Sequence, residues 1–284
     1  MTSEFKKIAV VGSGTMGSGI AIVLAQAGIE VNLVDIEQRF LDHGYQNIDK
    51  FLKSRLKRGK LSEEEIYNLK SRIKPFLVLE EAVQDIQLVI EAITEEEAAK
   101  KNLFEKLETY CESDVIFATN TSAIKISELA AATKRLDKFV GMHFFNPPAL
   151  MNLVEIISGN ATSDKTMERI LSLCELLGKT PVPSKESPGF IVNRLLWMFL
   201  NESYKLLEAG IAEKNHIDQA IKLGLNHPMG PFELSDYIGL DIMLEIGEYI
   251  KNQLGEKYEP AQLLREMVQQ GKLGRKTKEG FYEY

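Results

Sequence analysis

The chain has 284 residues, of which 44 % are apolar, a size and composition that suit one or two globular domains with a sizeable core. Its net charge of −7 at pH 7 argues against nucleic acid as a partner. Two cysteines and four histidines without metal-ligand spacing predict no metal site, and no window is apolar enough to predict a membrane span.

The chain opens on a predicted buried strand. Residues 6–11, KKIAVV, are a short apolar run bounded by charge, as is typical of a parallel strand. Because this strand begins so early, no secretory signal is predicted, and we expect a cytoplasmic protein without a membrane partner.

A glycine-rich turn with the spacing G-x-G-x-x-G follows this strand. The first glycine permits a tight turn, the second lets the backbone approach a pyrophosphate, and the third lets the next helix pack on the strand. The phosphates of a dinucleotide would then meet the helix N-terminus. The turn residues expected to bind a cofactor are Gly12, Gly14, Thr15, Met16 and Gly17. The alternative is a turn whose glycines only allow close packing between strand and helix.

The second predicted strand, residues 31–34, delivers an acid, Asp35, about 20 residues beyond the glycine turn. A carboxylate at this distance accepts hydrogen bonds from the ribose hydroxyls and repels a 2′-phosphate. The sequence therefore predicts NAD as the cofactor.

A long amphipathic stretch, residues 39–79, predicts a helical pair inserted into the sheet fold. Ser62, with a glutamate three residues later, predicts a capping box at the start of the second helix.

The inserted stretch contains a basic run, KSRLKRGK, at residues 53–60. Lys53, Lys57 and Lys60 have the spacing of one helix face, which could meet the phosphates of coenzyme A. A solvated helix face is the default alternative.

Three further predicted strands, residues 88–92, 115–118 and 139–143, continue an alternation of strands and helices. The first two lead to polar residues, Glu95 and the triplet at 120–122. Open α/β sheets bind ligands at the carboxyl ends of their strands. We therefore expect these polar residues to lie at a binding site.

His143 and Glu155, twelve residues apart, are a candidate acid/base pair. An imidazole titrates near neutral pH, and a carboxylate on its far nitrogen fixes the tautomer and stabilises the charged form. Beside a nicotinamide, such a base implies alcohol oxidation or ketone reduction. A histidine satisfied within the core is the alternative, although a buried carboxylate at position 155 is costly without a partner.

The alternation breaks at residues 181–189, PVPSKESPG, which predicts a domain boundary. Ser187 would cap a long apolar helix that begins at Pro188. The sequence thus predicts a Rossmann-type doubly wound α/β domain over residues 1–186 and a smaller all-α domain over residues 187–284. The apolar surface of the second domain predicts a homodimer or tight docking.

A set of motifs runs in order along nearly the whole chain: GSGTMGSGIA from Gly12, NTSAIKI from Asn120, GMHFFNPP from Gly141, LVEII from Leu153, SPGFIVNR from Ser187, KLGLNHPMGPFEL from Lys222 and LGRKTKEGFYEY from Leu273. In these motifs the chain resembles the 3-hydroxyacyl-CoA dehydrogenase family, most closely its bacterial short-chain members. The set is far more specific than the glycine turn alone. The resemblance implies an NAD-binding first domain and a second domain that binds substrate and forms a dimer.

The resemblance also implies roles for single residues. The family's catalytic histidine matches His143 and its partner glutamate matches Glu155, while Ser122 and Asn193 match polar residues that bind substrate. Beyond the glycine turn, the residues implied for NAD are Asp35, Glu95, Lys100, Ser122, Asn146 and Lys276. Without the resemblance, Ser122 could be a helix cap and Asn193 a polar residue bonded inside a helical core.

Two positions depart from the family pattern. Many relatives carry a second serine where this chain has Ala123, and Phe51 stands where some relatives have a serine thought to meet coenzyme A. The first departure leaves Ser122 intact. Because of the second, we assign contacts with coenzyme A only to the basic cluster, namely Lys53 and Lys57.

The predicted function is reversible, NAD-dependent oxidation of a (3S)-3-hydroxyacyl-CoA thioester, 3-hydroxybutyryl-CoA above all, by hydride transfer. One alternative is a dehydrogenase of a free hydroxy acid on the same architecture, which would not need the basic helix. Another is a non-catalytic, dinucleotide-binding redox sensor, which would not need the pair formed by His143 and Glu155.

Overall fold

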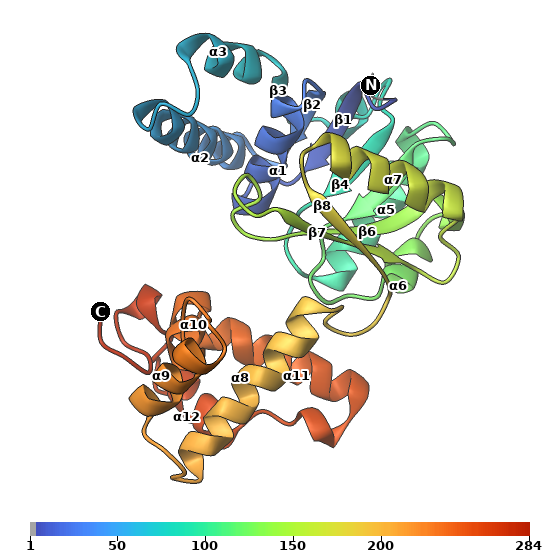
Figure 1. Cartoon of the computed structure of the whole chain (residues 1–284). Helices are drawn as coiled ribbons and strands as arrows, with labels where there is room; N and C mark the ends of the chain where they lie inside the picture. Colours follow the sequence, from blue (N-terminus) through green and yellow to red (C-terminus); the bar gives the residue numbers. More distant parts are fainter. Residues whose placement is uncertain (1–3) are drawn as a thin grey trace. The chain divides into compact units, whose positions relative to one another are not determined.

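The computed structural model describes residues 4–284, which divide into two compact units (Figure 1). The first unit ends at Glu186 and the second runs from Ser187 to Tyr284. In the described residues, no helix has both the length and the apolar composition needed to cross a membrane.

The first unit is built on one sheet, whose strand order within the described residues is β3-β2-β1-β4-β5-β6-β7-β8. The strands are β1 (Lys7–Val11), β2 (Glu30–Val34), β3 (Ile73–Phe76), β4 (Leu88–Glu91), β5 (Ile116–Thr119), β6 (Phe139–Phe144), β7 (Leu153–Ser158) and β8 (Thr180–Lys185). All neighbouring pairs are parallel except β6 and β7, which run antiparallel. The order reverses beside β1, and such a switch point is where open α/β sheets bind ligands.

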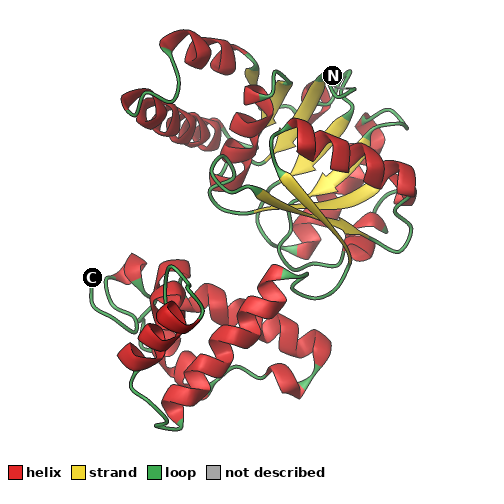
Figure 2. Ribbon diagram, in the orientation of Figure 1, coloured by secondary structure: helices red, strands yellow, loops and turns green. Residues whose placement is uncertain are grey.

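Helices connect these strands and cover the sheet (Figure 2). They are α1 (Thr15–Gln26), α2 (Gln38–Lys57), α3 (Glu63–Ser71), α4 (Leu79–Ala82), α5 (Glu97–Tyr110), α6 (Ile126–Ala130), the 3-10 turn η1 (Leu136–Lys138) and α7 (Asp164–Leu176). The predicted doubly wound α/β fold is confirmed.

The glycine turn between β1 and α1 is fixed by sterics. Gly12 has φ of 101°, a left-handed conformation that suits glycine, and a Cβ there would lie 2.5 Å from the carbonyl oxygen of Ala92. A Cβ on Gly17 would lie 1.7 Å from the carbonyl oxygen of Gly12. Both positions therefore require glycine, because the turn, α1 and the segment after β4 approach one another at backbone distance.

The inserted segment forms α2 and α3 as expected, and the capping box at Ser62 is present, with Glu65 as the reciprocal partner. The segment also contains β3, a strand that the amphipathic pattern did not predict. Its sequence IKPF includes a proline, which the ladder tolerates because β3 lies at the edge of the sheet.

The proline-rich boundary segment contains a second strand that the sequence did not predict. Residues 181–185 belong to β8, the opposite edge of the sheet, which pairs with β7. Pro181 and Pro183 fit there because an edge strand has one side without a partner, so a missing N–H breaks no ladder bond on that side.

The second unit is helical. Its elements are α8 (Val192–Glu208), α9 (Lys214–Gly224), α10 (Pro231–Ile238), α11 (Leu240–Leu254), η2 (Glu256–Tyr258), α12 (Gln262–Gln269) and η3 (Arg275–Thr277). They enclose a core around Trp197, Tyr204 and Phe232, each 0 % exposed. The Asp236 carboxylate accepts the backbone N–H groups of Phe281 and Tyr282, which anchors the last residues of the chain to this core.

The long apolar helix of this unit begins at Val192 and not at Pro188 as predicted. Gly189 and Phe190 have φ of 73° and 47°, in the left-handed region, so the chain turns before the helix starts. Ser187 is consequently no helix cap, and its hydroxyl accepts a hydrogen bond from the Arg194 guanidinium at 3.0 Å.

Candidate active site

His143 and Glu155 are joined by a direct hydrogen bond between His143 Nδ1 and Glu155 Oε2, at 2.7 Å. The two residues are register partners on the antiparallel strands β6 and β7, which places their side chains next to each other on one face of the sheet. Both are buried, with 6 % of His143 and 0 % of Glu155 exposed. The carboxylate therefore faces the imidazole in a low-dielectric setting, where the hydrogen bond orients the ring.

The polar residues after β5 lie at the same edge of the sheet. The Asn120 side-chain oxygen accepts the backbone N–H of Phe144 at 2.9 Å, which ties the end of β5 to the end of β6 beside His143. Ser122 follows two residues later. The carboxyl ends of β5 and β6 thus form one polar corner.

Glu95 organises this corner. Its Oε1 accepts the backbone N–H of Ser122 at 2.7 Å, the Ser122 hydroxyl at 3.2 Å and the Thr121 hydroxyl at 2.5 Å. Its Oε2 lies 3.2 Å from the Lys100 ammonium. Burial raises the pKa of the Glu95 carboxyl, but Lys100 and the hydrogen bonds outweigh it, so the pKa lies below its usual value. Glu95, Lys100 and Ser122, all predicted site residues, are therefore brought together.

Lys100 does not reach solvent, because only 1 % of its side chain is exposed. Its ammonium lies 2.5 Å from Glu91 Oε1, a residue that the sequence analysis did not single out. Burial raises the pKa of the Glu91 carboxyl, and the attraction of Lys100 opposes that rise. A charged residue inside the apolar run LVIEAI was the available signal, the same one that drew attention to Glu155.

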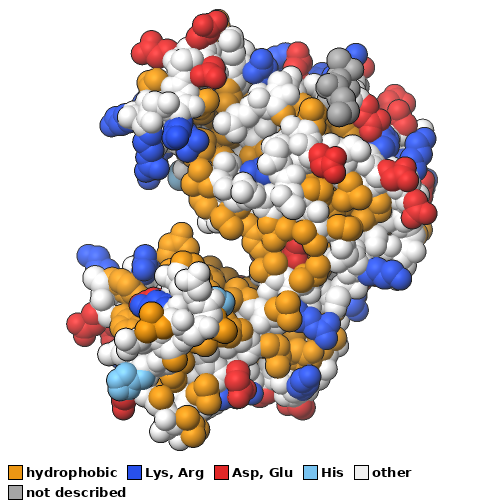
Figure 3. All heavy atoms as spheres, viewed as in Figure 1, with side chains coloured by type: hydrophobic (Ala, Val, Ile, Leu, Met, Phe, Trp, Pro, Cys, Tyr) orange, Lys and Arg blue, Asp and Glu red, His pale blue; other side chains and the backbone are white. Residues whose placement is uncertain are grey.

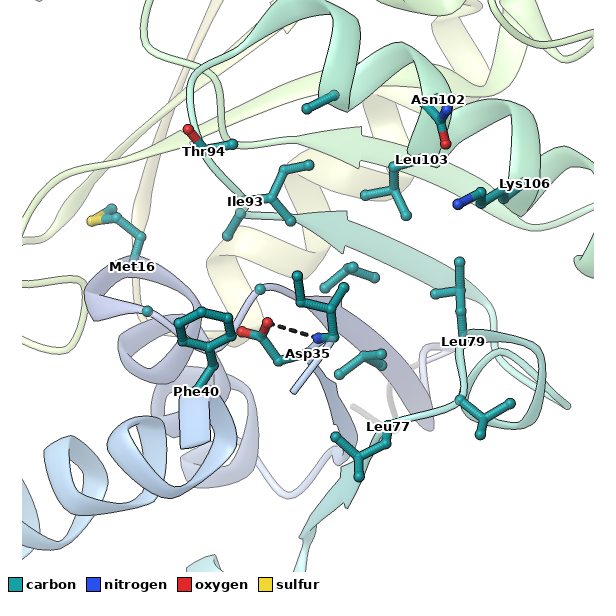
Figure 4. A pocket seen from close by; sticks show the side chains of 18 of the residues that line it. Met16, Asp35, Phe40, Leu77, Leu79, Ile93, Thr94, Asn102, Leu103 and Lys106 are labelled. Atoms are coloured by element: carbon teal, nitrogen blue, oxygen red, sulfur yellow. Dashed lines mark hydrogen bonds between the residues drawn. The ribbon is translucent and has the colours of Figure 1, made fainter. Parts of the chain in front are cut away.

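A cavity of about 950 Å³ opens at the switch point of the sheet (Figure 4). Its lining combines the glycine turn with the ends of β2 and β4 and part of α5, including Gly12, Gly14, Thr15, Met16, Asp35, Phe40, Ile93 and Thr94. Asp35 Oδ2 accepts both the backbone N–H and the hydroxyl of Ser13, each at 2.7 Å. Its Oδ1 accepts the backbone N–H of Ile36 at 2.8 Å, the dashed line in Figure 4.

The residues of this cavity fit a dinucleotide. If Gly14 carried a Cβ, no other atom would lie within 4 Å of it, so the space beside this residue is open. No side chain caps the first N–H groups of α1. An open, uncapped helix N-terminus is suited to a pyrophosphate. The apolar side chains Phe40, Leu77 and Val78 line the cavity near Asp35 and suit an aromatic base.

The basic cluster lies on α2. Gln46, Asp49, Lys50, Lys53, Ser54, Lys57 and Arg58 line a shallow hollow of about 660 Å³. Figure 3 shows basic side chains gathered where Figure 1 places α2. The prediction that Lys60 shares a helix face with Lys53 and Lys57 is wrong, because α2 ends at Lys57 and Gly59 turns the chain with φ of 64°. Lys50 takes that place, at the same helical spacing from Lys53.

The remaining predicted residues belong to other elements of the chain. Asn146 is exposed in the loop between β6 and β7. Asn193 lies in the first turn of α8, and Lys276 lies in η3 with its ammonium 2.5 Å from the Asp241 carboxylate, both within the second unit.

Two family models match the chain in succession. The model described as "3-hydroxyacyl-CoA dehydrogenase, NAD binding domain" matches residues 7–187, and the model described as "3-hydroxyacyl-CoA dehydrogenase, C-terminal domain" matches residues 189–284. NAD is therefore the cofactor of the first domain.

Individual relatives agree with this match. The chain is 44 % identical to a 3-hydroxybutyryl-CoA dehydrogenase of Clostridioides difficile, over 98 % of this chain and 99 % of the relative. Its structure matches the (S)-3-hydroxybutyryl-CoA dehydrogenase from Ralstonia eutropha with a TM-score of 0.96 and 42 % identity, covering 99 % of each chain. A diketoreductase of dicarbonyl compounds matches with a TM-score of 0.87 and 30 % identity, over 100 % of both chains. Two domain models that span almost the whole chain and relatives of this identity show that the protein belongs to the 3-hydroxyacyl-CoA dehydrogenase family.

Proposed function

We propose that this enzyme catalyses the reversible oxidation of (3S)-3-hydroxybutyryl-CoA, or a closely related 3-hydroxyacyl-CoA, to the 3-oxoacyl-CoA with NAD. The observation that carries the proposal is the 2.7 Å hydrogen bond between His143 and Glu155 at the carboxyl end of the sheet. NAD supplies the hydride-accepting chemistry when it is bound. The residues of the chain bind and orient the substrate and move its hydroxyl proton.

In this proposal His143 is the general base in the oxidation direction and the general acid in the reverse direction. Its Nδ1 is engaged by Glu155, so Nε2 is the nitrogen assigned to the substrate hydroxyl. Glu155 keeps the proton of the neutral ring on Nδ1 and stabilises the imidazolium formed when Nε2 accepts the hydroxyl proton.

We assign Ser122 and Asn193 to the oxygen atoms of the substrate, which they would hold by hydrogen bonds so that the carbon carrying the hydroxyl is correctly placed. The bonds from Ser122 to Glu95 support this role, because they fix both the backbone and the hydroxyl of the serine. The roles of Asn146 and Lys276 in NAD binding rest on the family resemblance.

The thioester substrate is supported by the basic hollow of α2. Lys50, Lys53 and Lys57 of α2 and Arg58 directly after it supply four positive charges to the hollow, opposed there by Asp49. The phosphates of coenzyme A fit this charge, and a small free acid would leave it unused.

A free oxo acid or diketone is the second candidate substrate class, favoured by the similarity to the diketoreductase. Measuring NADH absorbance with acetoacetyl-CoA and, separately, with acetoacetate distinguishes the two. We expect kcat/KM to be at least about 10²-fold higher for the thioester, because remote binding energy is used to position the reacting end. Equal values would support the free-acid function, and no turnover of either would support the redox sensor.

A further inference from the structure

Glu91 is a buried carboxylate outside the proposed acid/base pair. It ends β4 as the register partner of Val11 and Thr119 and is 0 % exposed. Its Oε1 accepts the Lys100 ammonium at 2.5 Å and the backbone N–H of Ile93 at 2.8 Å. Its Oε2 accepts the Thr119 hydroxyl at 2.6 Å.

Burial raises the pKa of the Glu91 carboxyl, but all of these partners act against that rise. The Lys100 ammonium at 2.5 Å supplies a positive charge, and the backbone N–H of Ile93 and the Thr119 hydroxyl donate to the carboxylate at 2.8 and 2.6 Å. Three donors on one buried carboxylate favour its charged form.

The charges of this cluster do not cancel. One ammonium, Lys100, serves two carboxylates, at 2.5 Å from Glu91 and 3.2 Å from Glu95. The described contacts add only neutral donors, so the cluster carries a net charge of about −1. Because Glu91 and Lys100 are buried, solvent screens this charge weakly.

The cluster lies directly beneath the cavity. The Ile93 backbone bonded to Glu91 belongs to the segment that lines the cavity, together with Ala92 and Thr94. That segment also packs on the glycine turn, since a Cβ on Gly12 would lie 2.5 Å from the carbonyl oxygen of Ala92. The Glu91 side chain is thus connected to the cavity wall through its hydrogen bond from the Ile93 backbone. It is connected to Ser122 through Lys100 and Glu95.

We propose that Glu91 is a positioning residue whose charge makes the buried cluster net negative and thereby favours the oxidised cofactor over the reduced one. NAD⁺ carries one more positive charge than NADH, on its nicotinamide ring, so a negative field at the site stabilises NAD⁺ selectively. Glu91 also holds Lys100 and, through it, Glu95 and Ser122 in place. The inference rests on the proposed cofactor site.

The test is Glu91→Gln, which keeps the shape of the side chain and removes one negative charge. The dissociation constants of NAD⁺ and NADH are measured by calorimetry without substrate. We expect the ratio Kd(NAD⁺)/Kd(NADH) to rise by about 3- to 10-fold, the size of a unit charge acting through a partly screened interior. If Glu91 had a purely structural role, its replacement would weaken the binding of NAD⁺ and NADH equally. An unchanged ratio of the two dissociation constants in the folded variant therefore overturns the proposal.

The double variant Glu91→Gln, Lys100→Met is the control for charge. It removes one negative and one positive group, which leaves the net charge of the cluster as in the original protein. Its ratio should return towards the original value even if both affinities fall. A ratio that stays as high as in the single variant would assign the effect to lost positioning and overturn the charge argument.

If Glu91→Gln does not fold, Glu95→Gln removes the same unit charge from a side chain that is 35 % exposed. The same rise in the ratio is expected there, and no rise overturns the proposal. Failure of the proposed function looks different, because the unmodified enzyme would then not reduce acetoacetyl-CoA, whatever the ratio in the variants.

Discussion

At the scale of single residues, the proposed proton transfer depends on a carboxylate and an imidazole that are adjacent across two strands. Both side chains are buried and joined by a hydrogen bond, which holds them in one arrangement. Such fixed partners need little rearrangement when charge develops on the ring, which is how a preorganised site lowers a barrier.

Replacing the base tests this arrangement. His143→Gln should lower kcat by about 10²- to 10⁴-fold while NADH affinity stays near its original value, because only proton transfer is lost. Steady-state reduction of acetoacetyl-CoA and a fluorescence titration of NADH measure the two effects. The exposed His216 allows a matched His216→Gln control, which should keep full activity. Full kcat in a folded His143 variant would remove this residue from the mechanism.

Asp35 should set the choice of cofactor. We expect a higher kcat/KM with NADH than with NADPH, and Asp35→Asn should narrow the difference, because a neutral amide no longer repels a 2′-phosphate. Arg39, a nearby cation, is already paired with Glu37 at 2.8 Å. Asp42→Asn, the same change on an exposed position of α2, is the control. Equal use of both cofactors by the unmodified enzyme would contradict this role of Asp35.

Much of the site could be predicted from sequence, but its connections could not. Glu95, Lys100 and Ser122 were assigned through the family resemblance, and the structure joins them in one network. Glu91 was missed because it belongs to no motif and its importance comes from partners 9 and 28 residues away in sequence. Contacts of that kind follow from tertiary packing and leave no local periodicity to read.

At the scale of elements, sequence patterns identified the type of an element better than they identified its bounds or the elements beside which it packs. The strand β7 was not predicted, and its antiparallel direction could not be read from an apolar run, which looks the same in either direction. β3 was missed because it lies within the amphipathic stretch that predicted two helices, and β8 was missed because its prolines resembled loop signals. The start of α8 was misplaced because a left-handed Phe190 is unusual for an aromatic residue.

The element with the clearest separate task is α2. Charge reversal at Lys53 and Lys57 should raise KM for acetoacetyl-CoA about 10-fold at low salt and less at high salt, since salt screens exposed charges beyond roughly 10 Å at 0.1 M. The same variant should turn over an acetoacetyl thioester that lacks the nucleotide part of coenzyme A almost as fast as the unmodified enzyme does. Measuring KM for both substrates at two ionic strengths tests this.

The matched control for α2 reverses charge at Lys134 and Lys165, two exposed lysines of the first unit outside the hollow. It should leave both KM values unchanged. A loss shared by both substrates in the α2 variant would point to a disturbed fold, and no loss for either would leave α2 as a solvated face.

At the scale of the whole molecule, the second unit exposes large apolar side chains despite its own core. Leu195, Ile211 and Leu223 are 66 %, 70 % and 76 % exposed. Isolated apolar side chains on a surface are ordinary, but several on one small helical unit favour an interface. The homodimer therefore stays our prediction, as does the cytoplasmic location.

Light scattering at micromolar concentration should show a dimer, and Leu195→Asp with Leu223→Asp should convert it to a monomer, because a carboxylate at an apolar interface loses its hydration. Tyr67→Asp, a change at a 74 % exposed aromatic residue of the first unit, should leave the dimer intact. A monomeric unmodified protein would rule the prediction out, as would dissociation caused by the Tyr67 change alone.

The antiparallel pairing of β6 and β7 also bears on the order of folding. His143 and Glu155 are 12 residues apart in the chain, whereas the bond from Lys7 to Gln87, which joins the start of β1 to the start of β4, spans 80 residues. Short loops close at a smaller entropic cost and sooner than long ones. During refolding, we expect the strands that carry the acid/base pair to gain protection against hydrogen exchange before the glycine turn does, so the chemical groups would be assembled ahead of the cofactor cradle.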